Sequence, residues 1–198
     1  MEHVDELIEL IKDDCLCVEL GGSRCLPFIR HPHDCDIIII CKDEEQVNKV
    51  KTILIEGEYR NTYRSKYGID IIVKPLSYSG DGILDAEFAY CPHYSKVLYG
   101  KRPEVDILKN EARVKQAVLN RMNRLLSKRI EGKSVPINEL KFWYRFYLVM
   151  CILKNQSYEL TEEQIETVNI LHDKEESQVE EKLKLIDEII KEIKLWQI

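Results

Sequence analysis

Two aspartates at alternate positions, Asp34 and Asp36, lead directly into the apolar run 37–41. A short apolar run of this kind is typical of a buried strand. Side chains two residues apart in a strand point to one face of the sheet, so both carboxylates can converge on one cation while Cys35 faces away. Hard divalent cations prefer such oxygen ligands. The motif therefore predicts a metal site at the start of a buried strand.

A turn of small residues precedes the aspartates. Residues 15–20 predict a strand that ends in Gly21, Gly22 and Ser23. Small residues let the backbone approach a ligand closely and expose its N–H groups. We therefore expect phosphate oxygens to bind at this turn.

A third acid, Asp70, is the one charged residue in the stretch 67–73, which predicts another strand. An isolated carboxylate in an apolar strand is unfavourable unless something pairs with it. A metal ion would provide that pairing.

In their order and spacing, these residues resemble the nucleotidyltransferases of the DNA polymerase beta superfamily. The pattern of that family is Gly-Ser, a spacer, Asp-x-Asp and an Asp on a later strand. The corresponding residues here are Gly22-Ser23, Asp34-Cys35-Asp36 and Asp70. The match covers about the first 75 residues, and the remainder is loosely similar to small bacterial and phage members with a helical tail. Family members often carry a second Asp or a Ser-Asp before the pair, where this chain has Pro32-His33, so the role of His33 is open.

The resemblance implies a fold and a mechanism. The fold would be α+β, with a polymerase-beta-like mixed sheet flanked by helices in a catalytic domain, residues 1–100, followed by a helical bundle, residues 104–198. Asp34 and Asp36 would hold two Mg²⁺ ions on a nucleoside triphosphate, with ATP as the expected donor. Asp70 would bind the metal that activates an acceptor hydroxyl and would accept its proton. The hydroxyl would attack the α-phosphorus, and pyrophosphate would leave.

Further residues are expected to contact the triphosphate. The resemblance implies that Gly22 and Ser23 hold the β- and γ-phosphates, with Arg24 adding positive charge. Lys96 is a candidate for neutralising the triphosphate, although a surface lysine is an ordinary feature. Of the aromatic cluster in residues 142–147, most side chains are expected in the core, with Tyr144 or Tyr147 as a candidate for stacking on a base.

Three functional interpretations remain open from the sequence. The first is a nucleotidyltransferase acting on a small molecule, a protein or an RNA. The second is a catalytically silent binding or antitoxin-like module of the same fold. The third is a nucleic-acid end-processing enzyme, against which the net charge of −6 argues. A zinc site at Cys25, His31, His33 and Cys35 is disfavoured because these residues lack the paired spacing of closed zinc sites.

Composition bounds the setting of the chain. The acidic N-terminus and the absence of a long apolar run predict a cytoplasmic protein without a signal peptide or membrane span. Its seven cysteines are odd in number and mostly lie in apolar contexts, so we expect reduced thiols. The long amphipathic C-terminal helices could support a homodimer.

Hydrophobic periodicity predicts the order of the elements. Helices are expected over residues 3–12 and 43–56, the second ending at Gly57, and paired strands over 59–64 and 69–73. Residues 75–103 are rich in glycine and proline, so they are predicted as a loop and hinge with a short element at 83–90. Helices follow over 104–130, 137–154 and 161–198, the last broken near His172. The first of these carries a basic face of Arg113, Arg121, Arg124 and Lys128 that could guide an anionic substrate, although a solvated helix face explains it more simply.

Overall fold

A computed structural model describes residues 2–32, 35–76, 93–102, 107–130, 143–173 and 179–197. The fold is α+β, and the chain divides into two compact units. The first, which we call the sheet unit, comprises Met1–Pro27, Pro32–Tyr78 and Tyr94–Glu104. The second, the helical unit, comprises Phe28–His31, Ser79–His93 and Val105–Ile198.

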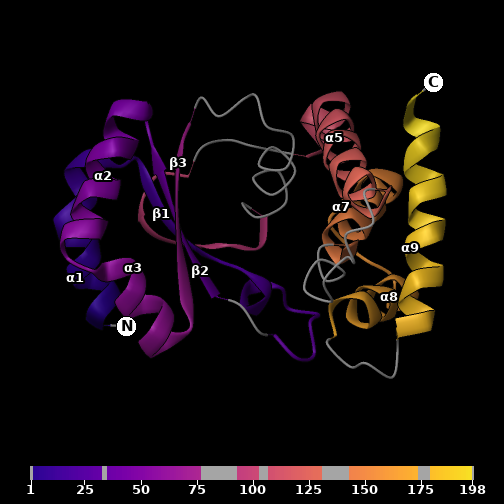
Figure 1. The fold of residues 1–198 in the computed structure, drawn as a ribbon, viewed down its shortest axis with the longest axis horizontal. Coiled ribbons are helices and arrows are strands. Elements are labelled where there is room, and N and C mark those ends of the chain that lie inside the picture. Colours follow the sequence, from indigo (N-terminus) through magenta and orange to yellow (C-terminus); the bar gives the residue numbers. More distant parts are fainter. Residues whose placement is uncertain are drawn as a thin grey trace. The chain divides into compact units, whose positions relative to one another are not determined.

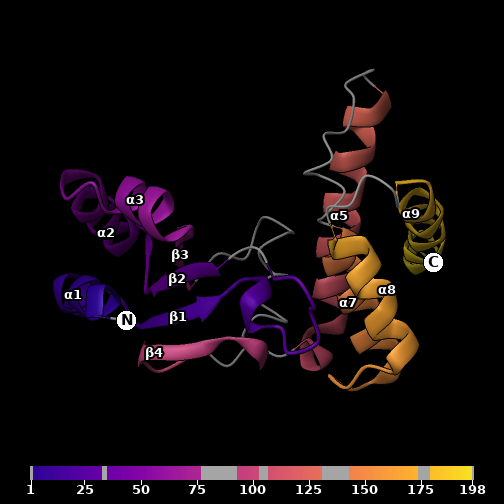
Figure 2. The same ribbon diagram turned by 90° about the horizontal axis from the view of Figure 1, so that it is seen from below.

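The sheet unit contains a mixed four-stranded sheet. Its strands are β1 (Cys17–Gly21), β2 (Cys35–Cys41), β3 (Ile69–Pro75) and β4 (Lys96–Gly100), in the order β3-β2-β1-β4 (Figure 2). β1 pairs antiparallel with both β2 and β4, whereas β2 and β3 are parallel. Parallel neighbours need a long crossover connection, which the helices between β2 and β3 supply.

Three helices cover one face of this sheet (Figure 1). They are α1 (Glu2–Ile11), α2 (Glu44–Glu56) and α3 (Tyr59–Thr62). Apolar side chains from α1, α2 and alternate strand positions form the core, including Leu7, Ile11, Val50, Leu54, Val18, Ile37, Ile39 and Ile71. The predicted helices over 3–12 and 43–56 are confirmed. Asp43 caps α2 through the N–H of Gln46, and Gly57 follows its last turn.

The predicted strand over 59–64 is wrong. Helix α3 runs directly into a π-helical turn, Tyr63–Tyr67. Tyr59, Tyr63 and Tyr67 are spaced four residues apart, which places them on one helical face. Tyr63 is buried in the core and meets the Tyr67 ring edge-on at 5.6 Å between centroids. Aromatic residues favour strands. In this segment, however, the four-residue spacing of the tyrosines and the crossover between β2 and β3 favour a helix.

The predicted loop over 75–103 contains a strand instead. Residues 96–100 form β4 at the edge of the sheet, while the expected short element at 83–90 lies outside the described residues. β4 is short and none of its side chains is fully buried, so the alternating pattern that identifies a strand is missing.

The helical unit contains α5 (Glu111–Ile130), α7 (Trp143–Asn155), α8 (Glu162–His172) and α9 (Val179–Lys194). Within the described residues these helices confirm the three predicted C-terminal helices and the break after His172, with α5 beginning at Glu111 and not at the predicted residue 104. Thr161 and Gln164 form a capping box at the start of α8. Most of the aromatic cluster is buried, as expected, and Tyr144 is only 2% exposed with its ring packed against His172. Tyr144 is therefore a core residue in this structure, not a platform for a base.

None of the helices within the described ranges combines the length and the apolar character needed to cross a lipid bilayer.

Candidate metal and nucleotide site

Asp36 and Asp70 lie side by side on two neighbouring parallel strands, β2 and β3. Neighbouring strands are about 4.8 Å apart, and residues paired in register project to the same face. The next pair in the ladder, Ile37 and Ile71, belongs to the core beneath α1–α3. The two carboxylates therefore project from the opposite face, which we call the second sheet face. The structure brings together two of the three predicted acids.

The two acids differ in exposure. Asp36 is 9% exposed, whereas the side chain of Asp70 is 57% exposed. Two carboxylates one strand spacing apart repel each other, and a cation between them relieves that repulsion. Such a pair fits a hard divalent cation, because the buried Asp36 carboxylate can bind the ion from the sheet while the exposed Asp70 carboxylate binds it on the solvent side.

The third predicted acid, Asp34, and the neighbouring His33 lie outside the described residues. Among the residues that the structure does describe, no group of three or more His, Cys, Asp or Glu side chains is placed to hold a metal ion. The two-acid pair is thus the part of the predicted triad that can be located.

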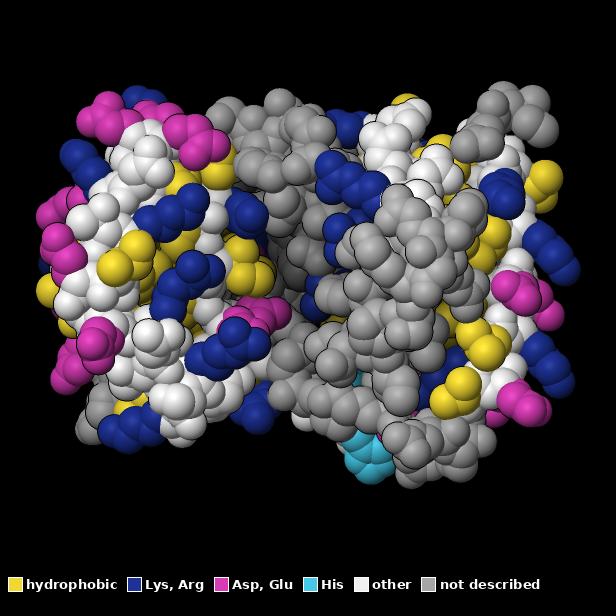
Figure 3. Space-filling model, in the orientation of Figure 1, with side chains coloured by type: hydrophobic (Ala, Val, Ile, Leu, Met, Phe, Trp, Pro, Cys, Tyr) yellow, Lys and Arg dark blue, Asp and Glu magenta, His cyan; other side chains and the backbone are white. Residues whose placement is uncertain are grey.

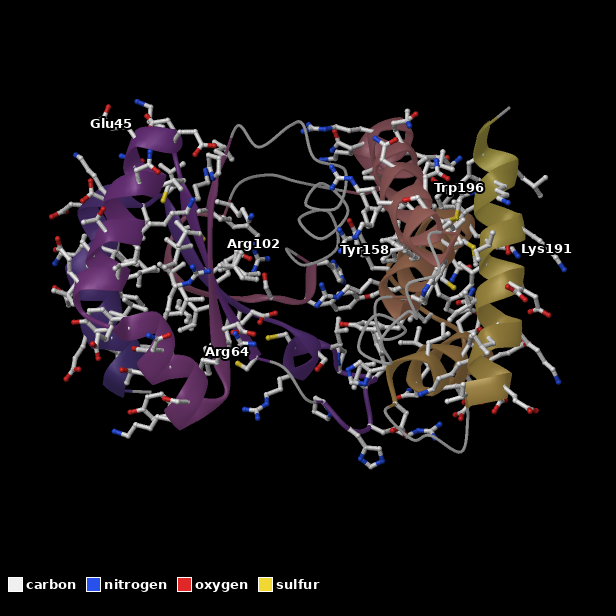
Figure 4. The ribbon with its side chains drawn as sticks, viewed as in Figure 1. Glu45, Arg64, Arg102, Tyr158, Lys191 and Trp196 are labelled. Atoms are coloured by element: carbon white, nitrogen blue, oxygen red, sulfur yellow. The ribbon has the colours of Figure 1, made fainter. Side chains whose placement is uncertain are left out.

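An arginine already contacts the exposed acid. Arg64, on the π-helical turn, places its Nε 3.5 Å from Oδ1 of Asp70, and both side chains are largely exposed. Figure 4 shows Arg64 near the beginning of β3. Exposed ion pairs of this kind contribute only about 0–1 kcal/mol. Such a contact is weak enough for another cation at Asp70 to displace it.

The glycine turn begins level with the acids. Gly21, the last residue of β1, pairs with Asp36 across the antiparallel ladder. A Cβ on Gly21 would come within 2.7 Å of Cδ1 of Ile38, so a larger residue would have to displace that side chain. Gly22 has φ of 85°, a left-handed value that favours glycine. The register therefore delivers the predicted phosphate-binding turn to the same end of the sheet as Asp36.

The remaining predicted phosphate ligands differ in accessibility. Ser23 is fully buried, and Arg24, within a short 3₁₀ turn, is exposed. Lys96 pairs with Leu20, whose side chain packs against the core beneath α1–α3. Alternation along the strand puts Lys96 on that face, so the register does not bring it to Asp36 and Asp70.

A buried carboxylate on the second sheet face went unrecognised in the sequence. Glu19 of β1 is 1% exposed, and its Oε1 accepts from Nε of Arg102 at 3.1 Å. Its Oε2 accepts from the hydroxyl of Ser95. Arg102 also donates from Nη2 to the carbonyl of Ser95 at 2.6 Å. These contacts tie both flanks of β4 to β1.

The sequence did carry a signal for Glu19. It is the one charged residue in the run 15–20, the same pattern that singled out Asp70. Its partner Arg102 lies 83 residues away, so no local pattern could identify the pair. Figure 4 shows Arg102 beside the sheet on the side away from α1–α3, where the Glu19 contact holds its guanidinium.

Two thiols of β1 and the following turn have raised pKa values. Burial, with the nearby Glu19 carboxylate, raises the pKa of the Cys17 thiol to about 12, and its Sγ donates to Oε1 of Glu19 at 3.6 Å. Burial also raises the pKa of Cys25, whose Sγ donates to the carbonyl of Leu20 at 3.1 Å. Both groups are therefore protonated thiols at neutral pH.

Figure 3 shows Lys and Arg side chains in the region of α5, and of the predicted basic face the side chain of Lys128 lies outside the described residues. Arg113 and Arg124 are exposed, and Arg121 is half-buried. Glu111 is the one acidic residue of the helix, and Lys115 pairs with it at 2.5 Å. The helix is therefore strongly basic within a chain of net charge −6.

Comparison with known proteins adds no assignment: no family model, curated protein or solved structure matches the chain. The candidate site therefore stands on its own residues and geometry.

Proposed function

We propose that the chain is a Mg²⁺-dependent nucleotidyltransferase that transfers a nucleoside monophosphate from a triphosphate to an acceptor hydroxyl. The observation that carries the proposal is the pairing of Asp36 with Asp70 in register on parallel strands. The turn at Gly21 and Gly22 begins at the same level of the sheet, which supports a phosphate site beside a cation site.

The residues divide the chemistry between them. Asp34 and Asp36 would hold Mg²⁺ with the triphosphate, and Asp70 would share in the binding of the metal. Bound Mg²⁺ supplies charge neutralisation for the phosphates and acidifies the acceptor hydroxyl. Because Ser23 is fully buried, the N–H of Gly22 and the exposed side chain of Arg24 would hold the phosphates. The exposure of Asp70 lets it meet an incoming acceptor and pass a proton to water.

The reaction balances without a further reactant. The acceptor oxygen forms a bond to the α-phosphorus while the bond from that phosphorus to the α–β bridging oxygen breaks. The hydroxyl proton passes to Asp70, directly or through water, and pyrophosphate leaves. We expect ATP as the donor. The acceptor is a small molecule, a protein or an RNA.

Calorimetric titration tests the proposal without knowledge of the acceptor. Each of the four ribonucleoside triphosphates is titrated with and without Mg²⁺ into the wild type, Asp36→Asn, Asp70→Asn and the double variant Asp34→Asn, Asp36→Asn. One triphosphate should bind in a Mg²⁺-dependent manner, and the Asp36 and double variants should lose about a hundredfold or more in affinity.

The matched control is Glu45→Gln, because Glu45 is exposed on α2, which covers the other face of the sheet (Figure 4). This variant should bind like the wild type. Unchanged Mg²⁺-dependent binding in the double variant would show that the acids are not metal ligands.

The contact between Arg64 and Asp70 favours a second candidate, a binding module of the same fold without catalysis, because a protein cation already occupies one acid. The variant Arg64→Ala separates the two. In an enzyme, removal of Arg64 should maintain or strengthen Mg²⁺-dependent binding of the triphosphate. Absence of such binding in both the wild type and Arg64→Ala would support the module.

A further inference from the structure

The segment Phe28–His31 belongs to the helical unit, although sheet-unit residues precede and follow it in the chain. It lies between the two motifs of the proposed site. Gly22 and Ser23 come before it, and Pro32 and His33 alone separate it from Asp34. The segment is therefore part of the chain that joins the phosphate turn to the proposed metal-binding acids.

One buried side chain of α8 holds the segment. Asn169 is 7% exposed, and its Oδ1 accepts from the backbone N–H of Arg30 at 2.8 Å. Its Nδ2 donates to the carbonyl of Phe28 at 2.9 Å and to the carbonyl of Ile165 at 2.8 Å. The amide thus uses both of its N–H groups and its oxygen, and it binds two backbone groups of the segment as a neighbouring strand would.

Two further contacts hold the same segment. Arg30 forms an ion pair with Glu166, three residues before Asn169 on α8. Ile29, between the two residues whose backbones Asn169 binds, is 7% exposed. A pocket of about 50 Å³, lined in part by Asn169 and His31, lies beside these contacts and has room for a few water molecules.

We propose that Asn169 is a positioning residue for triphosphate binding. It fixes the backbone at Phe28 and Arg30, and this limits the conformations of the chain that joins Gly22–Ser23 to Asp34–Asp36. A preorganised loop loses less conformational entropy when its ligand binds, so the bound state is favoured. The inference rests on the proposed function, because the ligand is the same Mg²⁺–triphosphate.

The test compares Asn169→Ala with a matched control, Asn155→Ala. Asn155 is also an amide of the helical unit, and it makes three hydrogen bonds, to the carbonyl of Glu159 and to both side-chain groups of Gln164. None of these contacts reaches Phe28–His31. The control therefore removes a similar set of hydrogen bonds without releasing the segment.

Two measurements are made on each full-length protein. Hydrogen exchange by NMR should show the Arg30 amide protected in the wild type and in Asn155→Ala, and exchanging about tenfold faster in Asn169→Ala. Calorimetry should show Mg²⁺-dependent triphosphate affinity reduced about tenfold in Asn169→Ala and unchanged in Asn155→Ala.

A surface variant keeps the proposal open to refutation if Asn169→Ala does not fold. Glu166→Gln removes the ion pair with Arg30, and its side chain is 49% exposed, so the fold should tolerate it. It should weaken triphosphate affinity about twofold to threefold. An affinity equal to that of the wild type would contradict the proposal in this arm.

The outcomes separate the two levels of inference. Faster exchange at Arg30 with triphosphate affinity equal to that of Asn155→Ala would overturn the positioning role and leave the proposed function intact. An unprotected Arg30 amide in the wild type would overturn the contact itself. Failure of the wild type to bind any triphosphate would overturn the proposed function and this inference with it.

Discussion

At the scale of single residues, two ion pairs of the sheet unit differ in burial. The carboxylate of Glu19 is 1% exposed and meets Arg102 at 3.1 Å, whereas Asp70 and Arg64 meet at 3.5 Å with both side chains largely exposed. Removing one partner of a buried pair leaves an uncompensated charge in the protein interior, which is strongly destabilising. An exposed pair is screened by solvent, so its loss costs little. The Glu19–Arg102 pair therefore stabilises the fold, whereas the Asp70–Arg64 pair leaves Asp70 available for a ligand.

We expect Arg102→Leu to lower the free energy of unfolding by about 3 kcal/mol, because the Glu19 carboxylate would lose its cation while buried. The same change at the exposed pair, Arg64→Leu, is the control and should cost less than about 1 kcal/mol. Urea denaturation at neutral pH measures both variants. Small and equal losses would show that Arg102 does not hold Glu19 as a buried carboxylate.

At the scale of elements, prediction from sequence succeeds where burial repeats with a regular period. The apolar stripes of α1 and α2 predict the core, and the family resemblance leads us to expect Asp36 and Asp70 at one site. Neither signal predicts that β2 and β3 pair in parallel, because the sequence predicts that residues 69–73 pair with 59–64. Prediction fails at β4, whose side chains are never fully buried, and at α3, where aromatic residues suggest a strand. Edge strands and short crossover helices depend on the sheet they join, so their own residues indicate them weakly.

The pairing of β4 with β1 depends on a close backbone approach at Gly100. This residue has φ of 73°, and a Cβ there would lie 2.1 Å from the carbonyl oxygen of Leu16. Gly68 provides a matched control, with φ of 65° and no atom within 4 Å of the corresponding Cβ. Gly68→Ala should cost about 1–2 kcal/mol from backbone strain alone.

Gly100→Ala should cost about 2 kcal/mol more than Gly68→Ala, because a backbone carbonyl cannot move aside as a side chain can. Thermal and urea unfolding of the two variants give the difference. Equal losses would mean that β4 does not approach Leu16 as closely as the structure indicates.

At the scale of the whole molecule, the two units are interleaved in sequence. Composition predicts a division near residues 100–104, where a glycine- and proline-rich stretch gives way to helical patterns. It gives no sign that Phe28–His31 belongs to the helical unit, because the contact is made by Asn169, 139 residues after Arg30. A separation of 83 residues likewise hides the pairing of Arg102 with Glu19. A charged residue isolated in an apolar strand can be recognised from its neighbours in sequence. The residues that position it lie far away in the sequence and cannot be recognised in this way.

Buried thiols in both units should make the stability of the molecule fall at alkaline pH. Burial raises the pKa of Cys17 and Cys41 to about 12 and that of Cys15 and Cys151 to about 11, from an ordinary value of 9.0. Between pH 9 and 11 the unfolded chain releases these protons while the native chain retains them. Unfolding then becomes more favourable as pH rises, by up to about 1.4 kcal/mol per pH unit for each thiol. The contribution of the thiols is fully present below pH 9.

Urea denaturation under reducing conditions from pH 7 to 10.5 measures this dependence. The thiol contribution to the free energy of unfolding should vary little near neutral pH. Above pH 9 the free energy of unfolding should decline steeply. Cys41→Ala removes one fully buried thiol. The stability lost to the cavity is the same at every pH. The decline of the free energy of unfolding with pH should therefore be shallower by the contribution of one thiol. A free energy of unfolding that stays constant to pH 10.5, or a slope that Cys41→Ala leaves unchanged, would show that these thiols are not protected from ionisation by the fold.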